Sequence, residues 1–294
     1  MRKPNFFVIG APRAGTTSLC AYLADHPLIY FSPVKEPSFF STDYPDLRRA
    51  AQREYGEYDD LFAGATDEHL AVGEGSTTYL SSRLAVPKIL EYNAKASFIV
   101  LLRHPADLAY SRHSSNVYHN NDDVEDFEQA WRLQSERACG RYLPPRCEDP
   151  LFVQYSKLYQ LGAQMERLYS HVDPERVLVH FFEDLANDPL QVYEGTLTFL
   201  GVPSDGRLSF PVVNRSRQMR SRAASKVLGF ISNIRALAVK RSLGIGSTLE
   251  RFNTNLHAPV GLRPEFRREL VEHFTQDIRK LSELTARDLS SWLD

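Results

Sequence analysis

Short, continuously apolar runs alternate along the chain with longer segments whose apolar residues recur at helical spacing. Such runs are typical of parallel strands covered on both faces, so the alternation indicates an α/β fold. We expect strands at residues 5–10, 28–31, 70–73, 97–102 and 176–182. We expect helices at residues 16–25, 82–93, 105–118, 153–171, 187–200 and 264–282, with a short one at 286–293. These elements predict a single domain over residues 1–294, a three-layer sandwich with helices on both faces of a central parallel sheet.

Residues at three of the expected helix starts favour initiation there. Thr16, Asn187 and either Pro105 or Asp107 are of types that cap a helix or occupy its first turn. We therefore expect helices to begin at or next to these positions.

Two segments, 119–150 and 206–260, do not fit the alternation, and we interpret them as substrate-side insertions or a lid. Residues 206–249 contain no Asp or Glu but nine Lys or Arg. This one-sided charge is compatible with a solvated lid or with a clamp on an anionic ligand. A third interpretation is a membrane-surface helix at "VLGFISNIRALAVKRSL".

The composition indicates more about the cellular location of the protein than about its function. At 294 residues and a formal net charge of −2, the chain is large enough for a substantial core and gives no global indication of nucleic-acid binding. The three cysteines form no CxxC pair, which favours a reduced, cytoplasmic location, although Cys139 and Cys147 could pair. We see no signal-peptide h-region and no apolar run long enough to span a bilayer, so we expect a soluble protein.

The stretch "FFVIGAPRAGTTSL", Phe6 to Leu19, runs from an apolar strand through a glycine-bounded loop into a helix start. This arrangement gathers backbone N–H groups and the positive end of a helix dipole around one point, which favours a bound phosphate or sulfate. Arg13 adds a charged fork suited to oxyanions, and the hydroxyls of Thr16, Thr17 and Ser18 add donors.

A magnesium-dependent P-loop kinase is one candidate for such a loop. That class needs a lysine after the second glycine and an aspartate that closes a later strand. Here Thr16 follows Gly15, and the apolar run "SFIVLL" is followed by Arg103. These residues favour a ligand that side chains bind directly, without magnesium.

Several motifs, in order, resemble the family of sulfotransferases that use 3′-phosphoadenosine-5′-phosphosulfate (PAPS). "GAPRAGTTSL" resembles that family's 5′-phosphosulfate loop, and "FIVLLRHPADLAYSRH" resembles its 3′-phosphate motif. "VLVHFFEDLANDPLQVYEGTLTFLGVP" resembles its later strand and helix, and "DIRKLSELTARDLSSWL" its closing helices. The resemblance implies a P-loop-like fold, PAPS as co-substrate and adenosine 3′,5′-bisphosphate as product.

The resemblance also implies binding roles for residues of this chain. The 5′-phosphosulfate would be held by Arg13, Ala14, Gly15, Thr16, Thr17 and Ser18. Arg103 and Ser111 would hold the 3′-phosphate, and Arg217 and Arg220 would close over it. Many family members have lysine where this chain has Arg13. Because arginine is a poor proton donor, we assign Arg13 electrostatic stabilisation and not acid catalysis.

Glu36 is the predicted general base. It lies in "SPVKEPSFFS" at the Glu-x-x-Phe-Phe spacing that resembles the family's carbohydrate-type branch, whereas the cytosolic branch uses a histidine. In that branch a lysine follows the glutamate of the next strand, but here Gly75 follows Glu74. Either another cation takes its place, Lys35 or an arginine between positions 215 and 222, or the acceptor differs from that of the carbohydrate-type branch.

His104 and His113 are alternative bases, although both follow the 3′-phosphate strand. The histidines and cysteines show no metal-ligand spacing, so we expect no metal.

The sequence therefore predicts a PAPS-dependent sulfotransferase that acts on a hydroxyl of a sugar, lipid head group or natural product. An ATP-dependent kinase and a non-catalytic nucleotide-binding module remain alternatives. The sequence does not indicate the oligomeric state.

Overall fold

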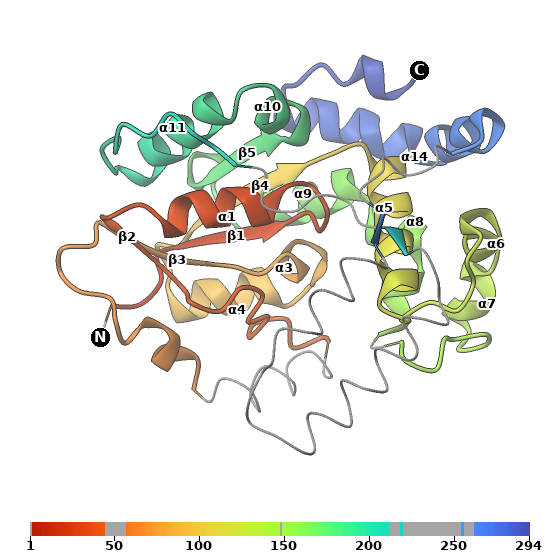
Figure 1. The fold of residues 1–294 in the computed structure, drawn as a ribbon, viewed down its shortest axis with the longest axis horizontal. Helices are drawn as coiled ribbons and strands as arrows, with labels where there is room; N and C mark the ends of the chain where they lie inside the picture. The colour runs from red at the N-terminus through yellow and green to blue at the C-terminus, as the bar shows by residue number, and fades with distance from the viewer. Residues whose placement is uncertain (1, 45–56, 148, 212–217, 220–253, 256–261) are drawn as a thin grey trace.

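A computed structural model of the protein describes residues 2–44, 57–147, 149–211, 218–219, 254–255 and 262–294. Its centre is a five-stranded parallel sheet in the order β2-β3-β1-β4-β5 (Figure 1). The strands are β1 (Phe6–Gly10), β2 (Ile29–Phe31), β3 (Ala71–Gly75), β4 (Ser97–Leu102) and β5 (Val177–Phe181). All five predicted strands are present, which confirms the α/β fold with a central parallel sheet.

Helices cover both faces of this sheet. Alternate residues of a strand point to opposite faces. In β3, a Cβ on Gly75 would point at Cys20 of α1 (Thr16–Ala24), whereas Glu74 bonds to Tyr79 of α3 (Thr78–Ser81). The sheet is therefore enclosed between two helical layers, and β1 is buried along its whole length. This explains why its sequence is apolar without alternation.

The remaining helices lie on the faces of the sheet or beyond the carboxyl ends of its strands (Figure 1). They are α4 (Ala85–Tyr92), α5 (Pro105–Tyr118), α6 (Phe127–Arg132), α7 (Gln134–Ala138), α8 (Tyr155–Leu158), α9 (Leu161–Tyr169), α10 (Phe182–Asn187), α11 (Pro189–Leu200) and α14 (Pro264–Thr285). Short 3-10 helices lie at Tyr58–Phe62, Pro150–Val153, Pro174–Arg176 and Ser290–Trp292. The short β6 (Gln218–Met219) and β7 (Thr254–Asn255) pair antiparallel.

The expected helix at 153–171 is wrong as one continuous element. Its residues form part of a 3-10 turn, then α8, and then α9 after a break at Gln160. A tertiary contact stabilises the new helix start, because Asp277 of α14 accepts hydrogen bonds from the N–H groups of Gly162 at 2.8 Å and Ala163 at 2.9 Å. These are two of the N–H groups that the first turn of a helix leaves without partners.

Other helix boundaries also differ from expectation. The segment 187–200 begins as a helix only at Pro189, because Asp188 accepts from the Gln191 N–H at 2.9 Å and acts as the cap. Asn187 instead ends α10, so its assignment as a helix start is wrong. Thr16 and Pro105 are the first residues of their helices, as predicted, but Gly15 and His104 occupy the cap positions. The expected helix at 286–293 is only the 3-10 turn Ser290–Trp292.

Segment 119–150 is fixed by a buried ion pair. Arg137 and Asp122 are fully buried and joined by two hydrogen bonds of 2.7 and 2.9 Å, and Tyr155 donates its hydroxyl to the same carboxylate at 2.7 Å. The α6 helix packs beside α5 and α14, where Phe127 contacts Phe266 (Figure 1). The segment is therefore an ordered part of the domain.

Candidate active site

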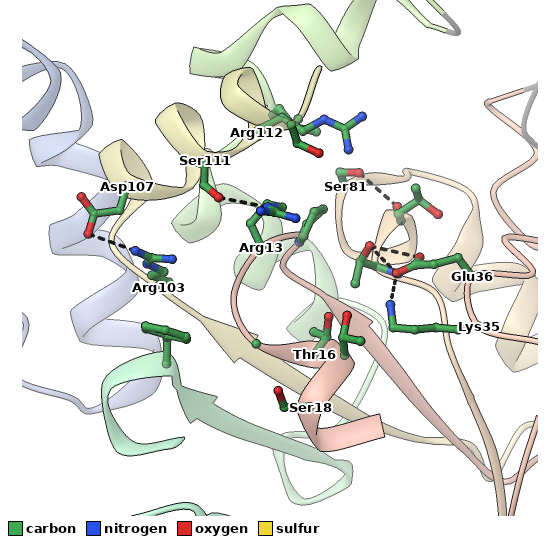
Figure 2. A pocket seen from close by; sticks show the side chains of 18 of the residues that line it. Arg13, Thr16, Ser18, Lys35, Glu36, Ser81, Arg103, Asp107, Ser111 and Arg112 are labelled. Atoms are coloured by element: carbon green, nitrogen blue, oxygen red, sulfur yellow. Dashed lines mark hydrogen bonds and ion pairs between the residues drawn. The ribbon is translucent and has the colours of Figure 1, made fainter. Parts of the chain in front are cut away.

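A cavity of about 780 Å³ lies at the carboxyl ends of the central strands (Figure 2). Its walls come from the loop after β1, the segment after β2, the helices α3, α5 and α10, and Phe152 and Leu158. Open parallel sheets bind ligands at this edge. Among the described residues, the cavity wall carries four cationic side chains, Arg13, Lys35, Arg103 and Arg112, but only two acidic ones, Glu36 and Asp107.

The loop after β1 forms one wall of this cavity. Gly15 has φ +90°, and a Cβ there would lie 2.8 Å from Leu185 Cδ2, so the tight approach to α10 requires glycine. Arg13 also has a positive φ, 74°, which is uncommon for a residue with a side chain. Thr16, Thr17 and Ser18 line the cavity at the start of α1, where a helix favours anions.

Ala14 does not reach the cavity. It is fully buried beneath the loop, and its N–H donates to the Ala11 carbonyl at 3.2 Å. The structure gives Ala14 a part in the turn, and its assignment to the 5′-phosphosulfate subsite stays a prediction.

Arg13 and Ser111 join the loop to α5. The Arg13 Nε–H donates to Ser111 Oγ at 2.9 Å, as Figure 2 shows. Burial lowers the pKa of Arg13, Tyr159 opposes this, and the nearby Arg112 and Arg103 lower it further. Three guanidinium groups are thus gathered at this part of the cavity, which favours an anionic ligand.

Arg103 lies at the end of β4, on the same cavity wall. Its guanidinium is 4.5 Å from the centre of the Phe182 ring and 3.8 Å from the Asp107 carboxylate. One flank of Arg103 is therefore held by protein groups, while the residue still lines the cavity. Arg13, Arg103 and Ser111, which come from two separate motifs, are brought together.

Arg112 is a cavity residue that the sequence reasoning missed. Its guanidinium lies 4.8 Å from the centre of the Phe152 ring, and its buried Nε has no hydrogen-bond partner within the described parts of the chain. In Figure 2 it points away from Arg103, on the side of Ser81. Its place directly after Ser111 was the available signal, but a helical pattern alone does not show which neighbour faces a cavity.

Glu36 lies on the other side of the cavity, beside the start of α3 (Figure 2). Its carboxylate accepts from the Thr77 N–H at 2.7 Å and the Thr77 hydroxyl at 3.0 Å, and it pairs with Lys35 Nζ at 2.5 Å. About one third of the Glu36 side chain is exposed (35%). A carboxylate that is held in this way and open to the cavity is placed to accept a proton from a ligand.

Gly75 cannot be replaced by a long side chain without rearrangement. A Cβ there would lie 2.6 Å from Cys20 Sγ and 3.4 Å from the Phe31 ring. Lys35 pairs with Glu36, and its role in place of the family's lysine stays a prediction. The other candidates, Arg215, Arg217, Arg220 and Arg222, lie outside the described residues.

The two histidines proposed as alternative bases serve the fold. His104 is buried, accepts from the Ala106 N–H through Nδ1 at 3.1 Å, and contacts the Trp292 carbonyl through Nε2 at 3.0 Å. His113 is buried against Phe127 and contacts the Val124 carbonyl at 2.8 Å. Burial lowers the pKa of both imidazoles, and neither residue lines the cavity.

The described parts of the chain carry no sign of a metal site, a disulfide or a membrane span. No group of three or more His, Cys, Asp or Glu residues there is arranged to hold a metal ion. Cys20, Cys139 and Cys147 are all free, so the alternative of a Cys139–Cys147 disulfide is wrong. No helix in this part of the chain has the length and apolar character needed to cross a bilayer.

Comparison with known proteins identifies the family. The family model described as the sulfotransferase domain matches residues 3–228. The chain therefore belongs to the sulfotransferase domain family, and the PAPS-dependent family that the motifs resembled is confirmed. The structure is similar to that of a sulfotransferase from Alicyclobacillus acidocaldarius, with a TM-score of 0.74 and 26% identity over the whole of both chains.

Two relatives are similar in sequence over shorter regions. The membrane-associated sulfotransferase kil1 of Dictyostelium discoideum is 28% identical over 114 residues, which are 39% of this chain and 23% of that protein. The bifunctional heparan sulfate N-deacetylase/N-sulfotransferase 3 of Mus musculus is 28% identical over 214 residues, which are 68% of this chain and 22% of that protein. Each matched region is less than a quarter of the relative's length.

Proposed function

We propose that this protein transfers a sulfuryl group from PAPS to a hydroxyl of an acceptor molecule, with Glu36 as the general base. The observation that carries the proposal is the 2.9 Å bond between Arg13 and Ser111, which unites the two predicted phosphate motifs at one cavity. Glu36 lines the same cavity. The family assignment supports the type of reaction.

The cavity fits PAPS in its chemistry. PAPS has anionic groups at two positions, and the cavity has cationic or hydroxyl-bearing side chains both on the loop after β1 and on Arg103 and the later turns of α5. Gly15, with φ +90°, allows the loop its tight turn against α10, where a Cβ would lie 2.8 Å from Leu185 Cδ2. Thr16, Thr17 and Ser18 would hold the 5′-phosphosulfate with Arg13, while Arg103 and Ser111 would hold the 3′-phosphate.

Each residue of the proposed site has a separate chemical role. Bound PAPS supplies an activated sulfuryl group. Glu36 takes the proton of the acceptor hydroxyl, and Lys35 and Thr77 hold its carboxylate in place. Arg13, with the hydroxyls of Thr16 and Thr17, stabilises the negative charge that develops on the departing phosphate. Because a guanidinium stays protonated, Arg13 acts through its charge.

We propose a carbohydrate or other small hydroxyl-bearing molecule as acceptor. The named heparan sulfate enzyme supports a carbohydrate, and the Glu-x-x-Phe-Phe spacing around Glu36 resembles the carbohydrate-type branch of the family. The free cysteines favour a reducing, cytoplasmic location, which stays a prediction because one relative is named as membrane-associated.

The test is a binding measurement followed by a transfer assay. Adenosine 3′,5′-bisphosphate should raise the melting temperature more than adenosine 5′-monophosphate does at equal concentration. Radiolabelled PAPS should then transfer its label to at least one of three probes: a heparan-type oligosaccharide, a 4-nitrophenyl glycoside or 4-nitrophenol. Bisphosphate binding without transfer would favour a non-catalytic module, and transfer from ATP that a chelator abolishes would favour a kinase. Either result would contradict the proposal.

A further inference from the structure

Glu74 is a fully buried carboxylate that the proposed chemistry does not use. It lies near the end of β3 and accepts hydrogen bonds from three hydroxyls. Tyr58 at 3.1 Å and Tyr79 at 2.7 Å donate to Oε1, and Ser76 at 2.7 Å donates to Oε2. In each of these bonds the hydroxyl is the donor, so its proton is directed toward a Glu74 oxygen and its own oxygen is left to accept.

Two of these three hydroxyls continue to the segment that carries Glu36. Ser76 Oγ accepts from the Ser38 N–H at 2.9 Å, and the Tyr79 hydroxyl accepts from the Phe40 N–H at 3.4 Å. Because both hydroxyl protons are committed to Glu74, the oxygen lone pairs are free to face these two backbone amides. Glu74 is thus connected to the segment from Ser38 to Phe40 by two hydrogen-bonded relays. One runs through the Ser76 hydroxyl to the Ser38 N–H, and the other through the Tyr79 hydroxyl to the Phe40 N–H.

The backbone around Glu36 needs such support. Glu36 has φ 64° and Ser38 has φ 51°, both in the left-handed region that residues with side chains rarely adopt. Such conformations are unfavourable and persist where the surrounding structure fixes them. The Glu36 N–H is held by the Gly75 carbonyl at 2.9 Å, next to Glu74 in the strand. The strand end and its hydroxyls therefore fix the turn on both sides of Ser38.

We propose that Glu74 is a positioning residue for Glu36. By orienting Ser76 and Tyr79, it holds the turn at 36–40 in the conformation that directs the Glu36 carboxylate to Thr77 and the cavity. This inference rests on the proposed role of Glu36 as base, and it adds to that role the buried groups that keep the base in position.

The variants that test it remove one hydroxyl at a time. Ser76→Ala and Tyr79→Phe each break one relay, whereas Tyr58→Phe removes a hydroxyl that donates to the same Glu74 oxygen as Tyr79 does. Among the described residues, the Tyr58 hydroxyl makes no hydrogen bond to the backbone at 36–40, so Tyr58→Phe is the matched control. The phenylalanine introduced at position 58 also keeps the ring that stacks on Phe39, with 4.7 Å between the two ring centres.

The first measurement needs no acceptor. In hydrogen exchange of the full chain, the Ser38 amide should exchange faster in Ser76→Ala and the Phe40 amide faster in Tyr79→Phe, because each amide loses its acceptor. Both amides should exchange at the wild-type rate in Tyr58→Phe. Unchanged exchange in the first two variants would overturn the inference, and so would equally faster exchange in all three.

The second measurement is turnover with whichever of the three acceptor probes the wild-type protein sulfates. A displaced base lowers kcat without changing nucleotide affinity, so Ser76→Ala and Tyr79→Phe should each lower kcat by up to ~100-fold at unchanged KM for PAPS. Tyr58→Phe should keep the wild-type kcat. A rise in KM for PAPS with unchanged kcat would overturn the positioning role.

A double-mutant cycle separates this inference from the proposed function. In a Glu36→Gln background, Tyr79→Phe should cause no further loss, because its effect acts through Glu36. If Glu36→Gln lowers turnover but Tyr79→Phe does not, the base assignment stands and the role of Glu74 is overturned. If Glu36→Gln keeps full turnover, the base assignment itself fails and the positioning role fails with it.

Discussion

The Arg13 Nε–H donates to Ser111 Oγ across 2.9 Å, although the two residues are 98 positions apart in the chain. The bond joins the loop after β1 to α5, the two elements that carry the proposed phosphate subsites. Arg13 adopts a positive φ of 74° at this point. Arg13 thus belongs to the first motif and contacts the second. Its substitution should therefore change the binding of both phosphate groups of the nucleotide.

Arg13→Ala should lower kcat by about 10²–10³-fold, which is the usual fall in kcat when an enzyme loses one preorganised hydrogen-bond donor to a developing oxyanion. Arg13→Lys keeps a positive charge but not the fork that reaches Ser111, so it should retain more turnover than Arg13→Ala and bind the bisphosphate less tightly than wild type. Steady-state kinetics with PAPS, together with calorimetric binding of adenosine 3′,5′-bisphosphate, measures both effects. Equal turnover in the two variants would contradict a role for the charge.

Arg103→Ala should weaken binding of adenosine 3′,5′-bisphosphate far more than binding of adenosine 5′-monophosphate. The physical reason is that Arg103 faces the same cavity as Ser111, and only the bisphosphate has a 3′-phosphate to contact. The loss should be at least about tenfold, since charge-assisted hydrogen bonds contribute roughly 1.5–3 kcal/mol. Calorimetry with both nucleotides checks this, and the monophosphate serves as the internal control. An equal loss for both nucleotides would place Arg103 elsewhere on the ligand.

Glu36→Gln should lower kcat by about 10²–10⁴-fold, the usual contribution of a general base, while leaving adenosine 3′,5′-bisphosphate binding intact. The amide keeps the size of the side chain and can still accept from the Thr77 N–H, so the fold should be preserved. Thermal shift with the bisphosphate is the control for the nucleotide site. A variant with wild-type turnover would exclude Glu36 as the base.

Burial raises the pKa of Glu74 to about 7 from 4.5, against the hydrogen bonds from Ser76, Tyr79 and Tyr58 that lower it, while nearby Glu36 raises it further. The folded state therefore keeps a proton that the unfolded chain loses. Its stabilising contribution is complete below about pH 4.5 and is lost as the pH rises through about 7.

Wild type should accordingly lose stability relative to Glu74→Gln between about pH 4.5 and 7, by an amount on the order of 3 kcal/mol. Urea unfolding of both proteins at several pH values measures the difference. A constant difference across this range would show that Glu74 does not titrate there.

The local pattern of the sequence determined most of the fold. Five continuously apolar runs became the five strands, because strands enclosed between two helical layers need apolar residues on both faces. The bounds of α5 at Pro105–Tyr118 agree with expectation because its start signals lie within a few residues of each other. For the same reason the glycine-bounded loop and the Glu36 segment could be recognised as motifs from residues close together in the chain.

Tertiary structure alone decided how these motifs meet. The contacts of Glu36 with Thr77, of Glu74 with Tyr58 and of α9 with Asp277 join residues from 16 to 115 positions apart. No periodicity in the sequence encodes such pairs. The break before α9 and the direction in which Arg112 points therefore could not be predicted. Local propensity determined where strands and most helices form, and long-range hydrogen bonds and packing determined which side chains share the cavity.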